Sequence, residues 1–452
     1  MVVVFIAVAV LVVGLLVAAH WYVWRRMVRD VAARGTWYRR AGTALVVLLP
    51  LTTVATQVAH RAGLPFAVER VLAWPGYLWL AVLLYLVLAL LVGEAVRPLL
   101  RRFLARRDAA RAPGETAGDS RTAPAGAVEP SEPAEPSGSS GGGTAATGRS
   151  APTALAVRGD DGASGGASGA GADRPAPGPS RRLFVARTVA VAAGTVAAGT
   201  VGYGTHGVLR GPRLKRVTVP LAKLPRAAHG YRIAVVSDIH LGPLLGRAHT
   251  QRIVDTINRA DPDLVAVVGD LVDGTVADLG PAAEPLSRLR SRDGSYFVTG
   301  NHEYFGDAGE WVDHVRELGV EPLENARREL PHFDLAGVND LAGEEEGQGP
   351  DFRRALGDRD TSRAVVLLAH QPVLIHEAVD HGVDLQLSGH THGGQMWPAT
   401  YVAGLANPTL AGLESYGDTQ LYVTRGAGAW GPPVRVGAES DITVVELAAK
   451  RA

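Results

Sequence analysis

The sequence predicts an α/β domain preceded by a membrane region. The first hundred residues are dominated by long apolar runs. Residues 105–180 are instead rich in Gly, Ala, Pro and Ser, and from about Val217 onward buried-strand patterns alternate with helical patterns. Such alternation is typical of α/β architecture. We therefore expect membrane helices, a linker and one globular domain, in that order.

Three apolar runs in the membrane region, residues 1–104, approach or exceed the roughly 20 residues that a helix needs to cross a bilayer. They cover residues 2–24, 41–59 and 74–96, and we interpret each as a transmembrane helix. The first run has no positive residue before it and no clean small-residue cleavage site, which favours an uncleaved helix over a signal peptide.

Arginines predict the orientation of these helices. They cluster between the first two runs and again after the third, whereas the loop between the second and third runs carries only Arg61 and Arg70. Because basic residues concentrate in cytoplasmic loops, the amino terminus is expected to lie outside the cell membrane.

The segment 105–180 lacks the apolar content that would offset the entropy of ordering it, so we interpret it as a disordered linker. Residues 181–209 follow a basic pair and are mildly apolar. Two interpretations stay open for them: a fourth transmembrane helix, or a signal anchor in which the stretch SRRLF, from Ser180 to Phe184, resembles a twin-arginine export signal. Both place the domain at 217–452 outside, so we expect a multi-pass protein of the cell membrane with an extracytoplasmic domain.

Composition excludes several kinds of site and partner. The chain has no cysteine, so thiolate metal sites and cysteine nucleophiles are excluded, and any metal must use His, Asp, Glu or Asn. With 45 basic and 45 acidic residues the formal charge is zero, so no global field favours a polyanion. We accordingly expect no nucleic-acid binding.

Polar residues with ligand chemistry follow five of the apolar strand patterns. They are Asp238 and His240, Asp270, Asn301 and His302, His370, and finally His390 and His392. Alone, Asp270 fits a turn or helix-cap residue, Asn301 a turn former, and His370 a core histidine with satisfied hydrogen bonds. Five such strand ends at the edge where α/β sheets bind ligands indicate a site. Imidazole and carboxylate ligands suit Mn²⁺, Fe²⁺ or Zn²⁺, and Asp270, a carboxylate among histidines, is the candidate to bridge two such ions.

The motifs that carry these residues resemble the calcineurin-like metallophosphoesterases. In order along the chain they are SDIH, GDLVDG, GNHE, AHQP and GHTHGGQ, within about residues 233–395. The trailing stretch RGAGAWGPPVRVGAESDITVVEL is similar to the membrane-associated bacterial phosphodiesterases of the YkuE and YaeI type. The resemblance implies a four-layer αββα sandwich, in which two β-sheets are flanked by helices.

The resemblance also implies a role for each residue. Seven residues would hold two divalent ions that share one carboxylate: Asp238, His240 and His392 for the first ion, Asn301, His370 and His390 for the second, and Asp270 between them. His302 would be the catalytic proton donor. The next residue is usually Asp in the family, and here it is Glu303, which leaves the orientation of His302 open. Asp273 is interpreted as a structural residue that caps or supports its loop.

The expected function is that of a metal-dependent phosphoric ester hydrolase. A hydroxide that bridges the two ions would attack phosphorus, and His302 would protonate the departing oxygen. The substrate is expected to be a phosphodiester or phosphomonoester, either a phosphorylated small molecule or a lipid- or envelope-linked phosphate. The alternative is a non-catalytic membrane receptor or scaffold with a structural metal site, but such a site needs no spare proton donor.

Overall fold

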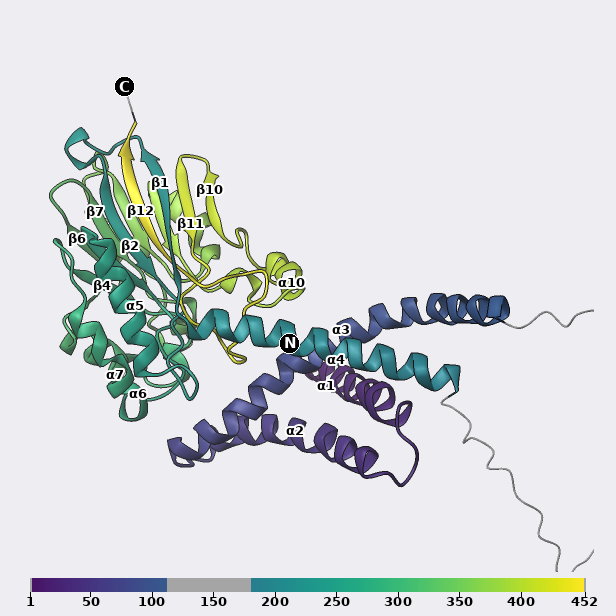
Figure 1. Cartoon of the computed structure of the whole chain (residues 1–452). Coiled ribbons are helices and arrows are strands. Elements are labelled where there is room, and N and C mark those ends of the chain that lie inside the picture. Colours follow the sequence, from purple (N-terminus) through teal and green to yellow (C-terminus); the bar gives the residue numbers. More distant parts are fainter. Residues whose placement is uncertain (1, 112–179, 451–452) are drawn as a thin grey trace, which may run out of the picture. The chain divides into compact units, whose positions relative to one another are not determined.

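The computed structural model describes residues 2–111 and 180–450 (Figure 1). Most of the predicted linker, residues 112–179, lies outside the described residues. The described residues at its start, 105–111, continue a long helix rather than leaving it.

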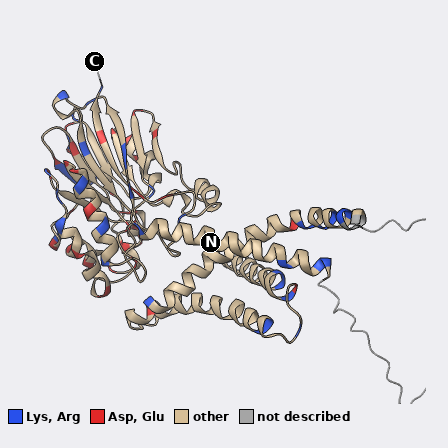
Figure 2. Cartoon of the chain, viewed as in Figure 1, with Lys and Arg blue, Asp and Glu red and all other residues tan. Residues whose placement is uncertain are grey.

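Four helices in the described residues are long and apolar enough to cross a membrane. They are α1 (Val2–Trp24), α2 (Trp37–Arg61), α3 (Phe66–Arg111) and α4 (Arg181–Leu209). Each covers one predicted apolar segment, and α2 and α3 extend beyond the predicted limits. Figure 2 shows Lys and Arg concentrated near one end of α3 and of α4, with uncharged residues along most of their length. This distribution suits helices whose middle faces lipid.

The first β-sheet contains six strands in the order β1, β12, β2, β3, β4, β5. Their bounds are β1 (Arg213–Leu221), β12 (Asp441–Ala449), β2 (Tyr231–Val236), β3 (Leu264–Val268), β4 (Ser295–Val298) and β5 (Glu321–Pro322). Strands β2 to β5 pair in parallel, whereas β12 pairs antiparallel with β2 and parallel with β1. β1 begins at Arg213, four residues before the predicted start of the domain at 217.

The second sheet also contains six strands, in the order β10, β11, β9, β8, β7, β6. Their bounds are β10 (Gly412–Tyr416), β11 (Thr419–Val423), β9 (Leu385–Ser388), β8 (Val365–Leu368), β7 (Asp334–Gly337) and β6 (Ala326–Glu329). Its centre is parallel, from β11 to β7, and its two edge strands pair antiparallel. The central strands of both sheets are buried along their whole length, as expected for sheets covered on both faces.

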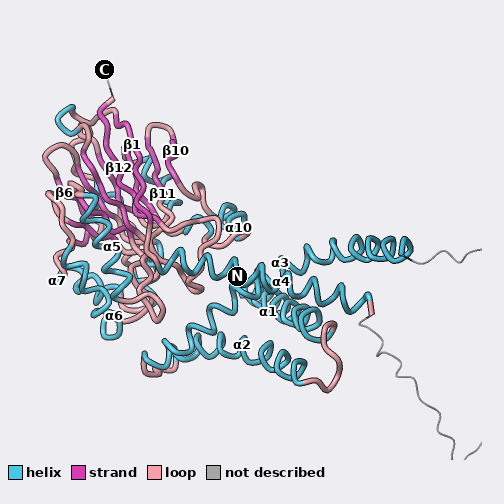
Figure 3. Tube along the Cα trace, viewed as in Figure 1, coloured by secondary structure: helices cyan, strands magenta, loops and turns pink. Residues whose placement is uncertain are grey.

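Helices cover the outer face of each sheet, and the inner faces pack on one another (Figure 3). On the first sheet lie α5 (Arg247–Ala260), α6 (Val276–Ala283) and α7 (Ala308–Glu317), whose apolar residues share a core cluster with β2 and β3. On the second lie α8 (Phe352–Leu356) and α9 (Ile375–Asp380). A further helix, α10 (Ala399–Ala406), follows the last predicted motif. The predicted four-layer αββα sandwich is confirmed.

The topology brings the predicted site residues to one place. The loops that follow β2, β3 and β4 in the first sheet carry Asp238, Asp270 and Asn301. The loops that follow β8 and β9 in the second sheet carry His370 and His390. Since all five strands run parallel within their sheets, these loops meet at the carboxyl edges of the two sheets.

Candidate metal centre

Five of the seven predicted ligands have a left-handed backbone. Their φ angles are 52° at Asp238, 48° at His240, 51° at Asp270, 71° at His390 and 52° at His392. Residues with a side chain rarely adopt such angles, at a cost of the order of 1–3 kcal/mol each. Strained residues of this kind cluster at functional sites, where the surrounding fold holds them in place. Here each strained residue lies two or four residues beyond the end of a parallel strand, β2, β3 or β9.

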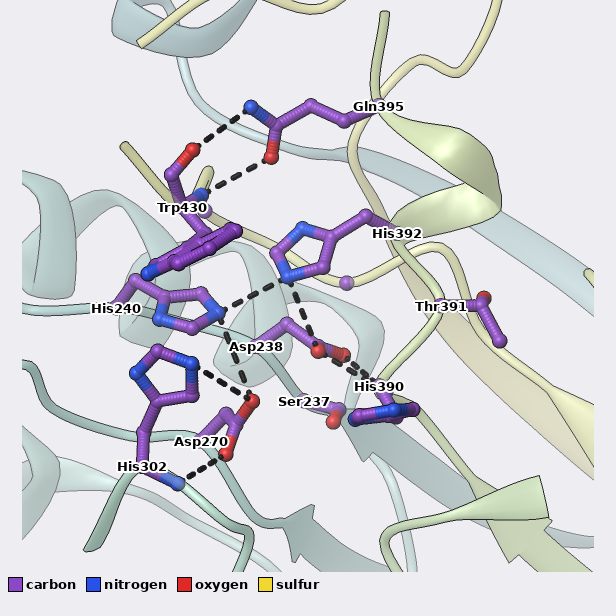
Figure 4. A network of polar contacts seen from close by, with 12 residues as sticks. Ser237, Asp238, His240, Asp270, His302, His390, Thr391, His392, Gln395 and Trp430 are labelled. Atoms are coloured by element: carbon purple, nitrogen blue, oxygen red, sulfur yellow. Dashed lines mark hydrogen bonds and ion pairs between the residues drawn. The ribbon is translucent and has the colours of Figure 1, made fainter. Parts of the chain in front are cut away.

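The first group of side chains consists of Asp238, His240 and His392, which offer ligand atoms within 4.8 Å of one another. The two imidazoles face each other, with Nε2 of His240 3.0 Å from Nε2 of His392. Nε2 of His392 also lies 3.3 Å from Oδ1 of Asp238. Figure 4 shows the two rings and the carboxylate directed at a common point.

The second group consists of Asp270, His370 and His390, again with ligand atoms within 4.8 Å. Nε2 of His370 lies 3.1 Å from Oδ2 of Asp270. Asn301 joins this group because its Oδ1 lies 3.0 Å from Nδ1 of His390. The four residues come from four different loops, so the fold rather than local sequence assembles them.

Asp270 lies between the two groups. Its Oδ2 is 3.7 Å from Nε2 of His240, in the first group, and 3.1 Å from Nε2 of His370, in the second. Its Oδ1 accepts a hydrogen bond from the backbone N–H of His302 at 2.9 Å. One carboxylate thus faces both groups, which is the position that the resemblance implied for a bridging ligand.

These residues fit divalent cations by the chemistry of their donor atoms. Two imidazole nitrogens and a carboxylate oxygen meet in the first group, and each offers a lone pair when the histidines are neutral. In the second group, Nδ1 of His370 donates to the Val268 carbonyl at 2.8 Å, which directs Nε2 toward Asp270. This buried Nε2 has Oδ2 of Asp270, at 3.1 Å, as its ion-pair partner but no well-aligned hydrogen bond within the described part of the chain. A cation bound by either group would coordinate the nitrogen and oxygen atoms that face one another there.

Without a bound cation, the carboxylates of the site favour the protonated forms of two of its histidines. Burial lowers the pKa of His240, but Asp273, Asp270 and Asp238 outweigh burial and raise its pKa to about 9. Burial lowers the pKa of His370 as well, but Asp270 outweighs burial and raises this pKa well above its ordinary value. Burial lowers the pKa of His390 to about 4. Two histidines therefore carry protons that a cation would displace.

His302 lies beside both groups and belongs to neither. Its Nδ1 donates to Oδ1 of Asp273 at 2.6 Å, which leaves Nε2 directed into the site, 4.0 Å from Oδ2 of Asp270. Aromatic side chains of Phe305 and Trp430 enclose the ring, with centroid distances of 4.7 and 5.7 Å. The nitrogen that could exchange a proton with a substrate is thus the one that faces the ligands.

Asp273 has a role that the sequence did not indicate. The same Oδ1 accepts from Nδ1 of His240 at 2.9 Å and from Nδ1 of His302. Burial raises the pKa of Asp273, but the two histidines outweigh burial and lower the pKa to about 2. The ionised carboxylate orients a ligand histidine and the predicted proton donor together, so its reading as a loop support was incomplete.

Glu303 does not contact the His302 ring through any hydrogen bond that the structure describes. It is fully buried, and its carboxylate accepts backbone N–H groups of Gly300 at 2.6 Å, Leu271 at 2.7 Å and Asp270 at 3.1 Å. Burial and then Asp270 raise the pKa of Glu303 to about 7. Glu303 therefore ties the loop after β4 to the loop after β3.

Two glycines allow the ligand loops to approach one another. A Cβ atom at Gly300 would collide with the backbone N and Oδ1 of Asp270. A Cβ atom at Gly389 would collide with Oγ of Ser237 and Oδ2 of Asp238. At both positions only glycine leaves room for a ligand carboxylate from another loop, which follows β3 for Gly300 and β2 of the other sheet for Gly389.

Arg435 is a second residue whose position the sequence did not reveal. The guanidinium is buried and donates to the carbonyls of Gly428 at 2.7 Å, Arg425 at 2.7 Å and His392 at 3.1 Å. Its Nη2 lies 3.0 Å from Nδ1 of His392. Burial lowers the pKa of Arg435 to about 10, so the group stays charged at neutral pH. It fixes the loop before β12 against a ligand residue rather than reaching solvent.

The chain is similar to known proteins over this region. A family model described as calcineurin-like phosphoesterase matches residues 231–394. A transmembrane protein with metallophosphoesterase domain from Danio rerio is 40% identical over 250 residues, which cover 52% of this chain and 57% of that protein. An uncharacterized metallophosphoesterase from Aquifex aeolicus is 32% identical over 243 residues, which cover 53% of this chain and 92% of that protein.

A further relative is the uncharacterized metallophosphoesterase YkuE from Bacillus subtilis, which is 29% identical over 242 residues, 51% of this chain and 83% of that protein. The chain spans little more than half the length of the animal relatives that it matches. The similarity and the two ligand groups concern the same segment, from β2 to the loop after β9. The chain belongs to the calcineurin-like metallophosphoesterases, a family of metal-dependent phosphoric ester hydrolases.

Proposed function

We propose that the chain is a membrane-anchored phosphoesterase that uses two divalent cations to hydrolyse a phosphodiester or a phosphomonoester. One observation carries this proposal: Asp270 of the second ligand group also faces His240 of the first, and the imidazole of His302 stands beside both groups. A structural metal site has no use for an imidazole that faces the ligands without joining them. A hydrolytic site needs such a group to protonate the departing oxygen.

The donor set divides into two cation positions that share one carboxylate. We assign Asp238, His240 and His392 to the first and Asn301, His370 and His390 to the second, with Asp270 facing both. When bound, the cations would acidify the attacking water and neutralise charge on the phosphate oxygens. Mn²⁺, Fe²⁺ and Zn²⁺ all accept this mixture of imidazole, carboxylate and amide ligands.

The protein's own groups act on the leaving side of the reaction. Asp273 holds Nδ1 of His302, so that the opposite nitrogen is presented to the substrate. His302 gives a proton to the ester oxygen as its bond to phosphorus breaks. The rings of Phe305 and Trp430 pack against this imidazole and help to hold its orientation. The Asp273–His302 pair is therefore the general acid of the proposed mechanism.

The four long apolar helices support membrane anchoring. We infer that α1 to α4 cross the cell membrane and that the α/β domain is extracytoplasmic, because α4 leads into β1 and the arginine-rich segments lie at the opposite ends of the helices. Helix α4 begins at Arg181, within the stretch from Ser180 to Phe184, so the basic pair Arg181 and Arg182 also serves as a cytoplasmic anchor in this arrangement.

The test is hydrolysis by the full chain in detergent micelles. With added Mn²⁺, we expect release of p-nitrophenol from bis-p-nitrophenyl phosphate or from p-nitrophenyl phosphate. A chelator should abolish the release, and returning Mn²⁺ should restore it. A metal-loaded protein that leaves both esters intact would contradict the proposal. It would favour the alternative, a non-catalytic membrane scaffold with a structural metal site.

A further inference from the structure

A chamber of about 630 Å³ adjoins the proton-donor side of the metal centre. His240, Asp273 and His302 line one end of it. The chamber reaches beyond the α/β domain, since part of its wall comes from helices α2 and α3. The site therefore faces helices α2 and α3 as well as solvent.

Four residues of the apolar helices line this chamber: Thr56 and Gln57 near the end of α2, and Glu69 and Tyr77 in the first turns of α3. Thr56 and Glu69 are buried. All four lie in segments that are long and apolar enough to cross a membrane. The wall opposite the site thus belongs to the helices that we infer to cross the membrane.

The remaining wall of the chamber is mostly apolar. It comes from three loops of the α/β domain, those after β2 and β4 and the one before β12, and carries Leu244, Leu245, Phe305, Ala429 and Trp430. A phosphate group alone would gain nothing from such a surface. An aliphatic chain attached to the phosphate would be removed from water there.

Contacts hold the helices against the domain at this place. Phe66, the first residue of α3, packs against the core cluster beneath the first sheet. The hydroxyl of Tyr85 in α3 donates to the carbonyl of Trp397 at 3.0 Å. Trp397 stands close to the last ligand motif, so α3 touches the loop that carries His392.

Helix α10 follows this loop and presents a bare apolar surface. It has no buried residue, and Tyr401, Val402 and Leu405 are 70%, 69% and 89% exposed. A soluble domain gains nothing by exposing such side chains together, whereas a bilayer surface would cover them. The tie between Tyr85 and Trp397 places the start of α10 next to a membrane helix. The site is therefore bordered on one side by the apolar helices α2 and α3 and on another by the exposed apolar surface of α10.

We propose that the substrate is a membrane-borne phosphate ester whose apolar chain occupies the chamber between the site and helices α2 and α3. This inference rests on the proposed phosphoesterase function and adds the substrate class. His302 lines the chamber, so the ester oxygen that it protonates is the one attached to the apolar chain. The lipid is thus the leaving alcohol.

The reaction is a hydrolysis in which every atom is accounted for. Water adds its oxygen to phosphorus, and the bond from phosphorus to the lipid oxygen breaks. His302 gives its proton to that oxygen, and the proton that the water loses restores His302. The products are a free lipid alcohol, which stays in the membrane, and the phosphate with any second substituent, which leaves to the aqueous side.

The test compares two monoesters that differ only in chain length. The full chain in detergent micelles, with Mn²⁺, is given butyl phosphate or hexadecyl phosphate, and inorganic phosphate is measured. Because each buried methylene adds to binding, we expect kcat/KM for hexadecyl phosphate to be at least about tenfold higher. Equal values for the two esters would overturn the lipid assignment while leaving the phosphoesterase function intact.

A second measurement does not depend on turnover. The chain has no cysteine, so Gln57→Cys provides a single thiol on the chamber wall, and Val58→Cys provides a matched thiol on the exposed neighbour, which does not line the chamber. Hexadecylphosphonic acid should slow maleimide labelling of the Gln57→Cys variant at least about threefold and leave the Val58→Cys variant unaffected. Equal labelling of both variants with and without the phosphonate would contradict occupation of the chamber, whatever the enzyme hydrolyses.

Discussion

Oδ1 of Asp273 lies 2.6 Å from Nδ1 of His302. The same oxygen accepts from Nδ1 of His240 at 2.9 Å, so one carboxylate connects the proposed general acid to a proposed metal ligand. Family resemblance drew attention to the residue after His302 as its partner. In this chain that residue, Glu303, binds backbone amides instead, and the carboxylate that orients His302 comes from the loop after β3. The position of the proton donor therefore depends on Asp273.

The variant Asp273→Asn tests this dependence. It keeps the size of the side chain but removes the charge that two imidazoles share, so we expect kcat to fall by about 100-fold or more. The loss should be larger for an alkyl phosphate than for p-nitrophenyl phosphate, because p-nitrophenolate departs with little help from an acid. Steady-state kinetics on the two esters measure the difference.

Asp255→Asn is a matched control, since Asp255 is an exposed residue of α5 outside the site. It should retain the activity of the unsubstituted chain on both esters. An equal loss on both esters for Asp273→Asn would mean that Asp273 supports the site without acting through His302.

Glu303→Gln should destabilise the fold. The carboxylate accepts backbone N–H groups of Gly300, Leu271 and Asp270 in a buried position, and an amide would turn a donor toward them. Losing such an acceptor costs about 1–3 kcal/mol of unfolding free energy. Denaturant unfolding in detergent, followed by tryptophan fluorescence, gives the change, with Glu317→Gln on the exposed end of α7 as the control. An unchanged midpoint for Glu303→Gln would contradict this role.

Gly300→Ala should weaken metal binding although it removes no ligand. A Cβ there would collide with the Asp270 carboxylate and its backbone nitrogen, so Asp270 has to move. Gly246→Ala is the control, because a Cβ at Gly246 meets open space and its φ of −117° suits alanine. We expect at least about a tenfold loss of Mn²⁺ affinity for the first variant and none for the second, measured by calorimetric titration. Equal Mn²⁺ affinities of the two variants would show that the loop after β4 accommodates a Cβ atom at position 300 without displacing Asp270.

His249 predicts how stability changes with pH. Burial in α5, with Arg252 and Arg435 adding to it, lowers the pKa of His249 from 6.5 to about 3. Between these values the unfolded chain binds a proton that the folded chain does not, so stability is full above pH 6.5 and falls as the pH decreases toward 3. The slope from this group is at most about 1.4 kcal/mol per pH unit.

Replacing the residue isolates that contribution. His249→Gln should show a flatter decline of unfolding free energy from pH 6.5 to 4.5 than the unsubstituted chain, since all other histidines are common to both proteins. Denaturant titrations at several pH values provide the comparison. Parallel curves for the two proteins would mean that His249 takes up its proton in the folded state.

The sequence was sufficient for the parts of the fold that depend on patterns. Alternating apolar strands and helices predicted the α/β class, and the motif order supplied the four-layer sandwich. Ligand chemistry at strand ends pointed to Asp238, His370 and their neighbours, because the carboxyl ends of parallel strands meet at one edge. The structure places all seven predicted ligands within two adjoining groups, with Asp270 between them.

Other features could not be read from residue types. An Asp two residues after a Gly-Asp-Leu turn is typical of a loop support, and only the packing of two sheets shows Asp273 between His240 and His302. Burial of the Arg435 guanidinium depends on carbonyls that only the fold brings to it. The left-handed angles at Asp238 and His392 occur in residues that seldom adopt them. The chamber joins residues between 56 and 77 to residues between 240 and 433, and no local pattern encodes such an approach.

The metal content and turnover of two variants test the central claim most directly. The full chain is purified in detergent, loaded with Mn²⁺ and analysed for bound metal and for hydrolysis of bis-p-nitrophenyl phosphate. We predict about two ions per chain. We also predict that His302→Ala keeps the metal and loses most of its turnover, while Asp270→Asn loses metal and turnover together. An Asp270→Asn variant with full metal content and normal turnover would contradict the proposed shared carboxylate and, with it, the two-cation mechanism.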